Sequence, residues 1–383
     1  MACAFVLNAN DTYSPMDTAR SRNNSGPIAF EGLQRMRFYV NDVITPVVFL
    51  FGMIGNVISF VVLSNRRLYP GRRQTMLERS AIFGLKILAL SDFSFCAFGL
   101  PAPFLRNHPG MPSDGPWVIL GAYYLAHKGA FLNLFLFTST WLIVLISVER
   151  YLVVCHPFRS ASMIHIRKTV VAYVTVLVVS LLVNLPLFLK FSIHREPCNA
   201  GCVCYYPQPS FFFATPLFVQ THKIVWFTVG TFLPLLLILT SNGFLVRELL
   251  RSHKAAAKEK RPSDPTSDES LTLRLTVTLT AIVVCFFVLV CPSIVLQFIR
   301  FEDYYDVISG VQSHLKSGNG YTKVCFQMAL SITNLTQALK FSSNFLLYCA
   351  INKTFRQTLR GLMRGDCCRR EQAPTNYEMG AMV

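Results

Sequence analysis

Apolar residues dominate seven stretches of this chain, each about 20 to 30 residues long, and polar segments separate them. A helix needs roughly 20 residues to cross a hydrocarbon core of about 30 Å. The apolar positions continue all around each expected helix, without the polar stripe of a surface helix in a soluble protein. Since lipid offers the backbone no water, we predict seven membrane-spanning helices. They are expected at about 43–63, 81–104, 118–148, 169–189, 224–246, 275–299 and 324–350.

Three segments lie outside this bundle, which we place at 41–351. Residues 1–40 are polar and lack periodicity, which is typical of a flexible outer tail. Residues 352–366 place apolar side chains on one face and arginines on another, which predicts a short amphipathic helix on the membrane surface. Residues 367–383 form a cytoplasmic tail. The predicted fold is therefore an all-α membrane protein, a seven-helix bundle with one short surface helix.

The formal net charge of +16 raises the question of nucleic-acid binding, which its distribution answers. The loops on one side of the bundle hold about 21 Lys and Arg residues, and the opposite set with the N-terminal tail holds about 12. Cytoplasmic loops carry such an excess, so the N-terminus is expected outside. Orientation and contact with acidic membrane lipid account for the basic residues, and we predict no nucleic-acid partner.

The two tails carry candidate modification sites. Asn10 and Asn23 begin glycosylation sequons in the outer tail. Cys367 and Cys368 directly follow the expected surface helix, which is a typical place for palmitoylation. The alternative for this pair is two unmodified cytosolic thiols.

Five cysteines fall on the oxidising outer face: Cys3, Cys198, Cys202, Cys204 and Cys325. Three of them lie within seven residues and resemble half of a zinc site, but no matching Cys/His set accompanies them. We therefore predict disulfides rather than a metal site. Because five is odd, one cysteine has no partner within the chain, and the connectivity stays open. One arrangement joins the second outer loop to Cys325.

Charged groups inside spans are costly and are therefore candidates for function. Asp92 lies in the second span, Arg150 ends the third beside Glu149, and Lys340 lies in the seventh. Asn56 and Asn344 add uncharged polar groups in the first and seventh spans. Pro234 and Pro292 interrupt the fifth and sixth, where each favours a kink.

Short motifs in these spans strongly resemble those of rhodopsin-like (class A) G-protein-coupled receptors. They are Gly55-Asn56-Val57, Leu88-Ala89-Leu90-Ser91-Asp92, Glu149-Arg150-Tyr151, Pro234, Phe286 with Pro292, and Asn344-Phe345-Leu346-Leu347-Tyr348. The resemblance covers about residues 43–368. It implies a plasma-membrane receptor whose partners are an extracellular ligand, a heterotrimeric G protein, arrestin and a receptor kinase.

The resemblance also implies roles for individual residues. Arg150 would engage the G protein in the active state and be held by Glu149 at rest. Tyr348 would swing inward on activation, and Asp92 would centre a polar network that includes Ser139.

Several positions depart from the family pattern. Leu125 stands where the family has a cysteine bridged to the second outer loop, so that bridge is absent. Val290 replaces a tryptophan of the sixth helix, which leaves the aromatic switch to Phe286 or its neighbour Phe287. Phe345 replaces the proline of the seventh helix, so that helix is expected to bend less.

Lys340 is the most consequential departure, because its position in the family helps to coordinate sodium around the second-helix aspartate. Opposite charges attract strongly in a low dielectric, whereas either charge alone is costly. We therefore predict an internal Asp92–Lys340 ion pair and agonist binding that is insensitive to sodium. The alternative is that Lys340 points elsewhere or is neutral.

The ligand class follows partly from exclusion. Leu132 and Ala338 occupy the positions of the amine-binding aspartate and the retinal-binding lysine, which argues against a monoamine and against light sensing. The segment 184–188 and the long second outer loop look like invertebrate FMRFamide-type neuropeptide receptors. Polar or aromatic candidates for ligand contact are Lys128, His222, Trp226, Gln297, Gln327 and Asn334. A lone histidine such as His222 is more often a packed residue.

Two other classes are alternatives to a receptor. An ion-coupled transporter or channel would place Asp92 and Lys340 on a charge pathway, but it leaves the Glu149-Arg150-Tyr151 motif unexplained. An enzyme would need a catalytic grouping, a metal set or a cofactor motif, and the sequence shows none. We therefore predict a receptor without cofactor.

Overall fold

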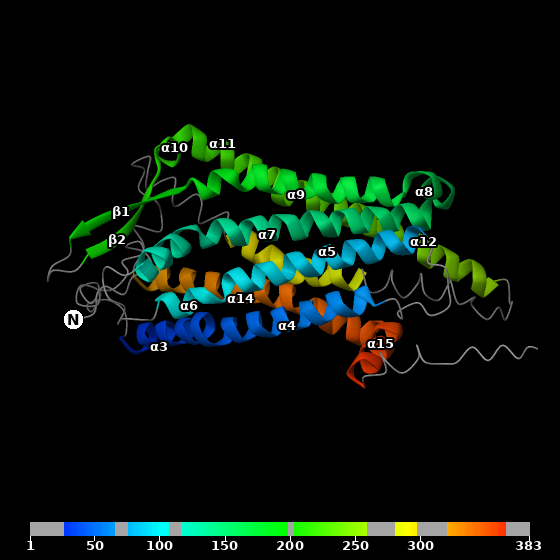
Figure 1. Cartoon of the computed structure of the whole chain (residues 1–383), viewed down its shortest axis with the longest axis horizontal. Helices are drawn as coiled ribbons and strands as arrows, with labels where there is room; N and C mark the ends of the chain where they lie inside the picture. The colour runs from blue at the N-terminus through cyan, green and yellow to red at the C-terminus, as the bar shows by residue number, and fades with distance from the viewer. Residues whose placement is uncertain are drawn as a thin grey trace, which may run out of the picture.

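The computed structural model describes residues 27–65, 76–106, 116–197, 203–258, 280–296 and 320–364. The long helices lie side by side along one direction and form a single bundle (Figure 1). The helical elements are α3 (Pro27–Phe38), η1 (Tyr39–Ile44), α4 (Thr45–Ser64), α5 (Met76–Gly99), α6 (Pro101–Arg106), α7 (Pro116–Cys155), α8 (Pro157–Met163), α9 (Ile166–Phe188), α10 (Phe211–Ala214), α11 (Pro216–Phe227), η3 (Thr228–Phe232), α12 (Leu233–Lys258), the yellow helix Thr280–Leu296, α14 (Gly320–Ile351) and α15 (Lys353–Met363). Two strands, β1 (Phe191–Pro197) and β2 (Val203–Pro209), lie at one end of the bundle, and α8 and α15 lie at the other.

Five helical segments among the described residues are long and apolar enough to cross a membrane. The apolar helix Thr280–Leu296 falls in the sixth expected span, and α14 covers the seventh with 32 residues. α14 is less apolar because Gln337, Lys340 and Asn344 are polar, yet all three are buried within the bundle and away from lipid. The predicted seven-helix bundle is therefore confirmed.

The expectation of a flexible tail over residues 1–40 is wrong for its last part. α3 begins at Pro27, and the helix continues through the π-helical segment η1 into α4. Polar side chains on this extension bond to α14, because Arg37 donates to Gln327 and Asn41 Nδ2 donates to Ser331 Oγ at 2.9 Å. A polar helix that docks on another helix gives no apolar run, so hydropathy does not reveal it.

The fifth span changes its winding at its middle. Thr228–Phe232 form the π-helical segment η3, and Pro234 is the second residue of α12. Pro234 cannot donate a backbone hydrogen bond, and a π-segment is one of the usual accommodations. Trp141 Nε1 of α7 donates to the carbonyl oxygen of Val229 in this segment at 3.0 Å.

The segment between α9 and α10 contains an antiparallel hairpin, which the sequence pattern does not predict. β1 and β2 pair from Phe191 with Pro209 to Pro197 with Val203. Tyr205 of β2 is buried against Val118 and Ala122 near the N-terminal end of α7. The hairpin therefore rests on the bundle.

The amphipathic helix expected after the last span is α15. The Asn352 side chain caps its N-terminus by accepting a hydrogen bond from the backbone N–H of Phe355 at 3.1 Å. Phe355 is fully buried beside Tyr348, whereas Met363 and Arg364 are exposed. One Nη atom of Arg356 donates to the carbonyls of Cys349 and Ala350, which lie in the last turn of α14, where carbonyls lack partners within the helix.

Candidate functional site

An ion pair between α5 and α14 lies in the middle of the bundle. Lys340 Nζ is 3.2 Å from Asp92 Oδ1, and the two side chains are 1% and 0% exposed. Ser139 of α7 completes a triangle, since its hydroxyl accepts from Lys340 Nζ at 2.6 Å and donates to Asp92 Oδ1 at 2.8 Å. The predicted ion pair is thus present, and it ties together three helices.

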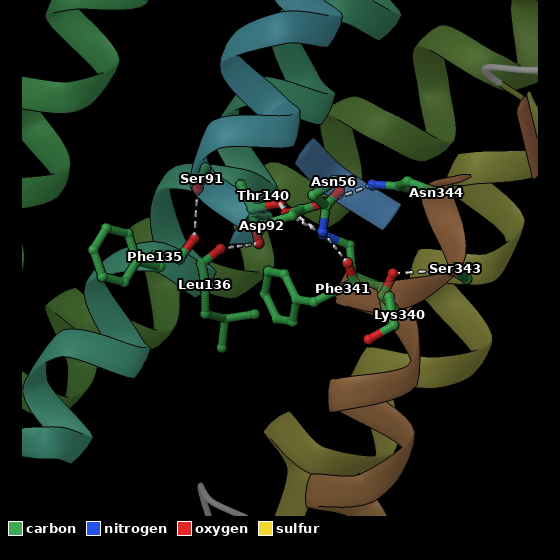
Figure 2. A network of polar contacts seen from close by, with 12 residues as sticks. Asn56, Ser91, Asp92, Phe135, Leu136, Thr140, Lys340, Phe341, Ser343 and Asn344 are labelled. Carbon is green, nitrogen blue, oxygen red and sulfur yellow. Dashed lines mark hydrogen bonds and ion pairs between the residues drawn. The ribbon is translucent and has the colours of Figure 1, made fainter. Parts of the chain in front are cut away.

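Two asparagines extend this network (Figure 2). Asn344 Nδ2 donates to the second carboxylate oxygen of Asp92, and Asn56 Nδ2 of α4 donates to the carbonyl oxygen of Phe341 at 2.9 Å. The Asp92 carboxylate therefore receives hydrogen bonds on both oxygens. A buried charge needs such partners, because each one replaces hydration that burial removes.

Aromatic rings enclose the ammonium group of Lys340. Its Nζ lies 4.0 Å from the ring centroid of Phe341 and 5.9 Å from that of Phe286. Phe341 stacks on Phe95 with centroids 3.7 Å apart. The negative face of an aromatic ring attracts a cation, so these rings stabilise the buried ammonium group. Phe286, the expected switch residue, is fully buried within this group.

A second polar cluster lies near the C-terminal end of α7. The Glu149 carboxylate accepts a hydrogen bond from Ser80 Oγ of α5 at 2.9 Å, and Ser80 Oγ lies 3.1 Å from Thr169 Oγ1 of α9. Arg150 is only 4% exposed. The Tyr151 hydroxyl lies 3.0 Å from Nε2 of His156, where α7 ends. Sequence reasoning found the motif but not Ser80 and Thr169, whose small hydroxyls carry no signal by themselves.

The C-terminal end of α14 and the N-terminal end of α15 pack around Tyr348. Its ring centroid lies 5.4 Å from that of Phe355, and the Tyr348 side chain is 2% exposed.

Pro292 lies within the helix Thr280–Leu296, which continues through this residue, and its side chain is exposed on the bundle surface.

Two predicted ligand residues join α11 to α9. Trp226 Nε1 donates to Asn184 Oδ1 at 3.2 Å, and His222 Nε2 lies 3.3 Å from the carbonyl oxygen of Val183. Both side chains are buried, and Trp226 packs in an apolar cluster with Phe213. Both residues therefore contribute to helix packing, and their role in ligand contact stays a prediction.

Three of the other ligand candidates, Lys128, Gln327 and Asn334, lie on α7 and α14. Asn334 Oδ1 and Gln337 Oε1 of α14 lie 3.4 and 3.5 Å from the Ser293 hydroxyl of the helix Thr280–Leu296. Gln327 accepts from Arg37 of α3, and Lys128 is half-buried on α7. Gln297 lies outside the described residues.

Most of the predicted modification sites also lie outside the described residues: Asn10, Asn23, Cys3, Cys198, Cys202, Cys367 and Cys368. Cys204 belongs to β2, in register with Glu196. Cys325 is a free thiol near the outer end of α14, so the suggested bridge from the second outer loop to this residue is not present.

Comparison with known proteins identifies the fold. The sequence pattern of the 7 transmembrane receptor (rhodopsin family) matches residues 71–339. The chain belongs to this family. This receptor is 23% identical over 357 residues to "G-protein coupled receptor E1" of Equine herpesvirus 2 (strain 86/87), covering 92% of this chain and 80% of that protein. It is 27% identical over 326 residues to the B1 bradykinin receptor of Macaca mulatta, covering 85% and 82%. It is 26% identical over 317 residues to that of Mus musculus, covering 82% and 86%.

Family membership settles the broad class. The chain is a multi-pass receptor of the plasma membrane, a G-protein-coupled receptor and not an enzyme. Its Asp92–Lys340 pair and its outer hairpin are features of this receptor that the match alone does not describe.

Proposed function

We propose that this receptor binds an extracellular peptide and activates a heterotrimeric G protein by opening its cytoplasmic face. The burial of Arg150 carries the proposal. Its side chain is 4% exposed at the inner end of α7, so a cytosolic partner reaches it only when the helix ends separate. Agonist binding would favour that open arrangement by population shift.

Glu149 is the group that opening would disturb. Its carboxylate bonds to Ser80 of α5, which in turn lies beside Thr169 of α9. These contacts join three helices at the inner face and favour the closed arrangement. Tyr348, buried against α15, is the second group that we expect to move.

A peptide suits the outer half of the bundle. Side-chain amides of Gln327, Asn334 and Gln337 lie on α14, and such groups both donate to and accept from a peptide backbone. The relatives named B1 bradykinin receptor are named for a peptide ligand. These observations support a peptide without selecting its sequence.

FMRFamide-like neuropeptides are the specific ligands that we propose to test first. The support is the resemblance of the segment 184–188 and of the long second outer loop. Asn184 itself has a packing role, because it bonds to Trp226. Kinin-like peptides are the second group to test, because two relatives are named B1 bradykinin receptor.

The orientation and the remaining partners are part of the same proposal. The basic loops favour an extracellular N-terminus, which would put the hairpin outside and Arg150 inside. Arrestin and a receptor kinase would then act on the cytoplasmic tail.

The decisive experiment is a peptide screen on cells that express the full chain, with calcium and cyclic AMP measured together. An active peptide should lose its response in Arg150→Ala and keep it in Arg251→Ala, which changes an exposed arginine of α12. Surface expression is measured for each variant. A full response in Arg150→Ala contradicts the coupling mechanism, and peptide-induced ion flux without a G protein favours the transporter or channel alternative.

A further inference from the structure

The outer hairpin is held on the bundle by an apolar contact. Tyr205 of β2 is 9% exposed and packs with Val118 and Ala122 of α7, which are 7% and 3% exposed. Ile193 of β1 packs against the same group. We call these four residues the hairpin joint. The backbone N–H of Ser210 donates to the carbonyl of Lys190 at 2.9 Å and closes the hairpin at its base.

The sequence of α7 excludes a direct disulfide between this helix and the hairpin. α7 has one cysteine, Cys155, and it is the last residue at the opposite end of this helix. Cys325 of α14 is free. Buried apolar surface is therefore one of the contacts that hold the hairpin on α7.

The strand register explains why this face of the hairpin meets α7. Tyr205 pairs with Arg195, and Ile193 pairs with Pro207. Directly paired residues share a face of an antiparallel sheet, so Ile193 and Tyr205 lie on one face. Ser192 and Gln208 pair one position along and are exposed on the other face.

We propose that Tyr205 is a positioning residue for ligand binding, which seats the hairpin on α7 as a wall of the ligand entrance. The tyrosine ring supplies the largest apolar side chain of the joint, and its loss leaves Ile193 to hold the hairpin. This proposal rests on the proposed function, because the hairpin affects binding only when the ligand enters from this end.

The first test needs no ligand. Backbone hydrogen exchange is measured on the full receptor in lipid nanodiscs. Tyr205→Ala should speed exchange of the β1 and β2 amides by about 10- to 100-fold, the range expected for losing a buried aromatic side chain. Tyr205→Phe, which keeps the ring, and Gln208→Ala, on the exposed face, should match the wild type.

A milder variant guards against misfolding. Val118→Ala trims the joint from the α7 side and should speed hairpin exchange by a few fold. Reductant should leave exchange at the hairpin base unchanged. The claim that the joint holds the hairpin is overturned if both Tyr205→Ala and Val118→Ala exchange at the wild-type rate. It is also overturned if reductant speeds exchange as much as Tyr205→Ala does.

The second test uses a peptide agonist from the screen above. Tyr205→Ala should raise the concentration for half-maximal response about tenfold or more, from the same apolar loss, and keep the maximal response. Tyr205→Phe should restore the potency. Unchanged potency in Tyr205→Ala with a loosened hairpin overturns the positioning role. If no peptide is active, the exchange data still show whether the hairpin joint holds the hairpin on α7. A failure of the proposed peptide function can therefore be told apart from a failure of the hairpin joint.

Discussion

Removal of the Lys340 charge should destabilise the bundle, because it leaves the Asp92 carboxylate as a lone charge in a fully buried site. Both side chains are at most 1% exposed, and their charged atoms are 3.2 Å apart. Removing one partner of such a pair usually costs about 3–5 kcal/mol. Ser139 and Asn344 still donate to the carboxylate in Lys340→Met, so we expect a cost near the lower end of this range.

A double-mutant cycle separates the effect of the ion pair on stability from the effect of side-chain size. Thermal unfolding of ligand-free receptor in detergent is measured for Lys340→Met, Asp92→Asn and the combination. Each single variant should unfold at a lower temperature, and the combination should recover most of the loss because no charge stays unpaired. Lys353→Met, which removes an exposed lysine of α15, is the control. Additive losses, or a Lys340→Met variant as stable as the control, would refute the reasoning.

The same variants test the sodium prediction. Lys340 fills the position beside Asp92 with its own ammonium group, so wild-type stability and agonist affinity should not change when sodium replaces choline at constant ionic strength. In Lys340→Met the buried Asp92 carboxylate has lost its positively charged partner, so a sodium ion bound beside it should stabilise the variant. A clear sodium effect on agonist affinity in the wild type contradicts this interpretation.

Three further predictions concern single contacts. Asn352→Ala should destabilise α15 by about 1 kcal/mol through loss of its N-terminal cap, seen as faster hydrogen exchange over 353–363. Trp226→Phe removes the hydrogen bond to Asn184 and should lower the unfolding temperature without changing agonist potency; a large potency loss at normal stability would make Trp226 a ligand contact. Gly84→Ala should cost about 1–3 kcal/mol because the new methyl group collides with the Tyr173 hydroxyl, and adding Tyr173→Phe should recover part of this loss of thermal stability.

Features that depend on lipid or on charge cost could be predicted from the sequence. Long apolar runs located the spans, since lipid contact selects them directly. Asp92 and Lys340 could be paired from their positions within the spans, because each charge is too costly alone inside a membrane. The amphipathic pattern after the last span likewise located α15.

Features that depend on which elements contact one another could not be predicted from the sequence. α3 is polar, and it and η1 each bond to α14 through a contact that no local pattern reveals. His222 and Trp226 have the same residue types as ligand contacts, and only the position of α9 shows that they pack. The hairpin escapes prediction because its two seven-residue strands contain three prolines, a residue that is depleted in strands.

The π-helical segment η3 has a consequence for engineered receptors. Each extra residue in a helical turn shifts the following side chains by about 100° around the axis. The side chains of α12 are therefore rotated around the axis, relative to those of α11, from where an unbroken α-helix would place them. Trp141 donates a hydrogen bond to the carbonyl of Val229 within η3. A chimera that takes α12 from a receptor with a regular fifth helix should be joined after Phe232, because a junction before η3 would rotate the side chains that follow around the helix axis.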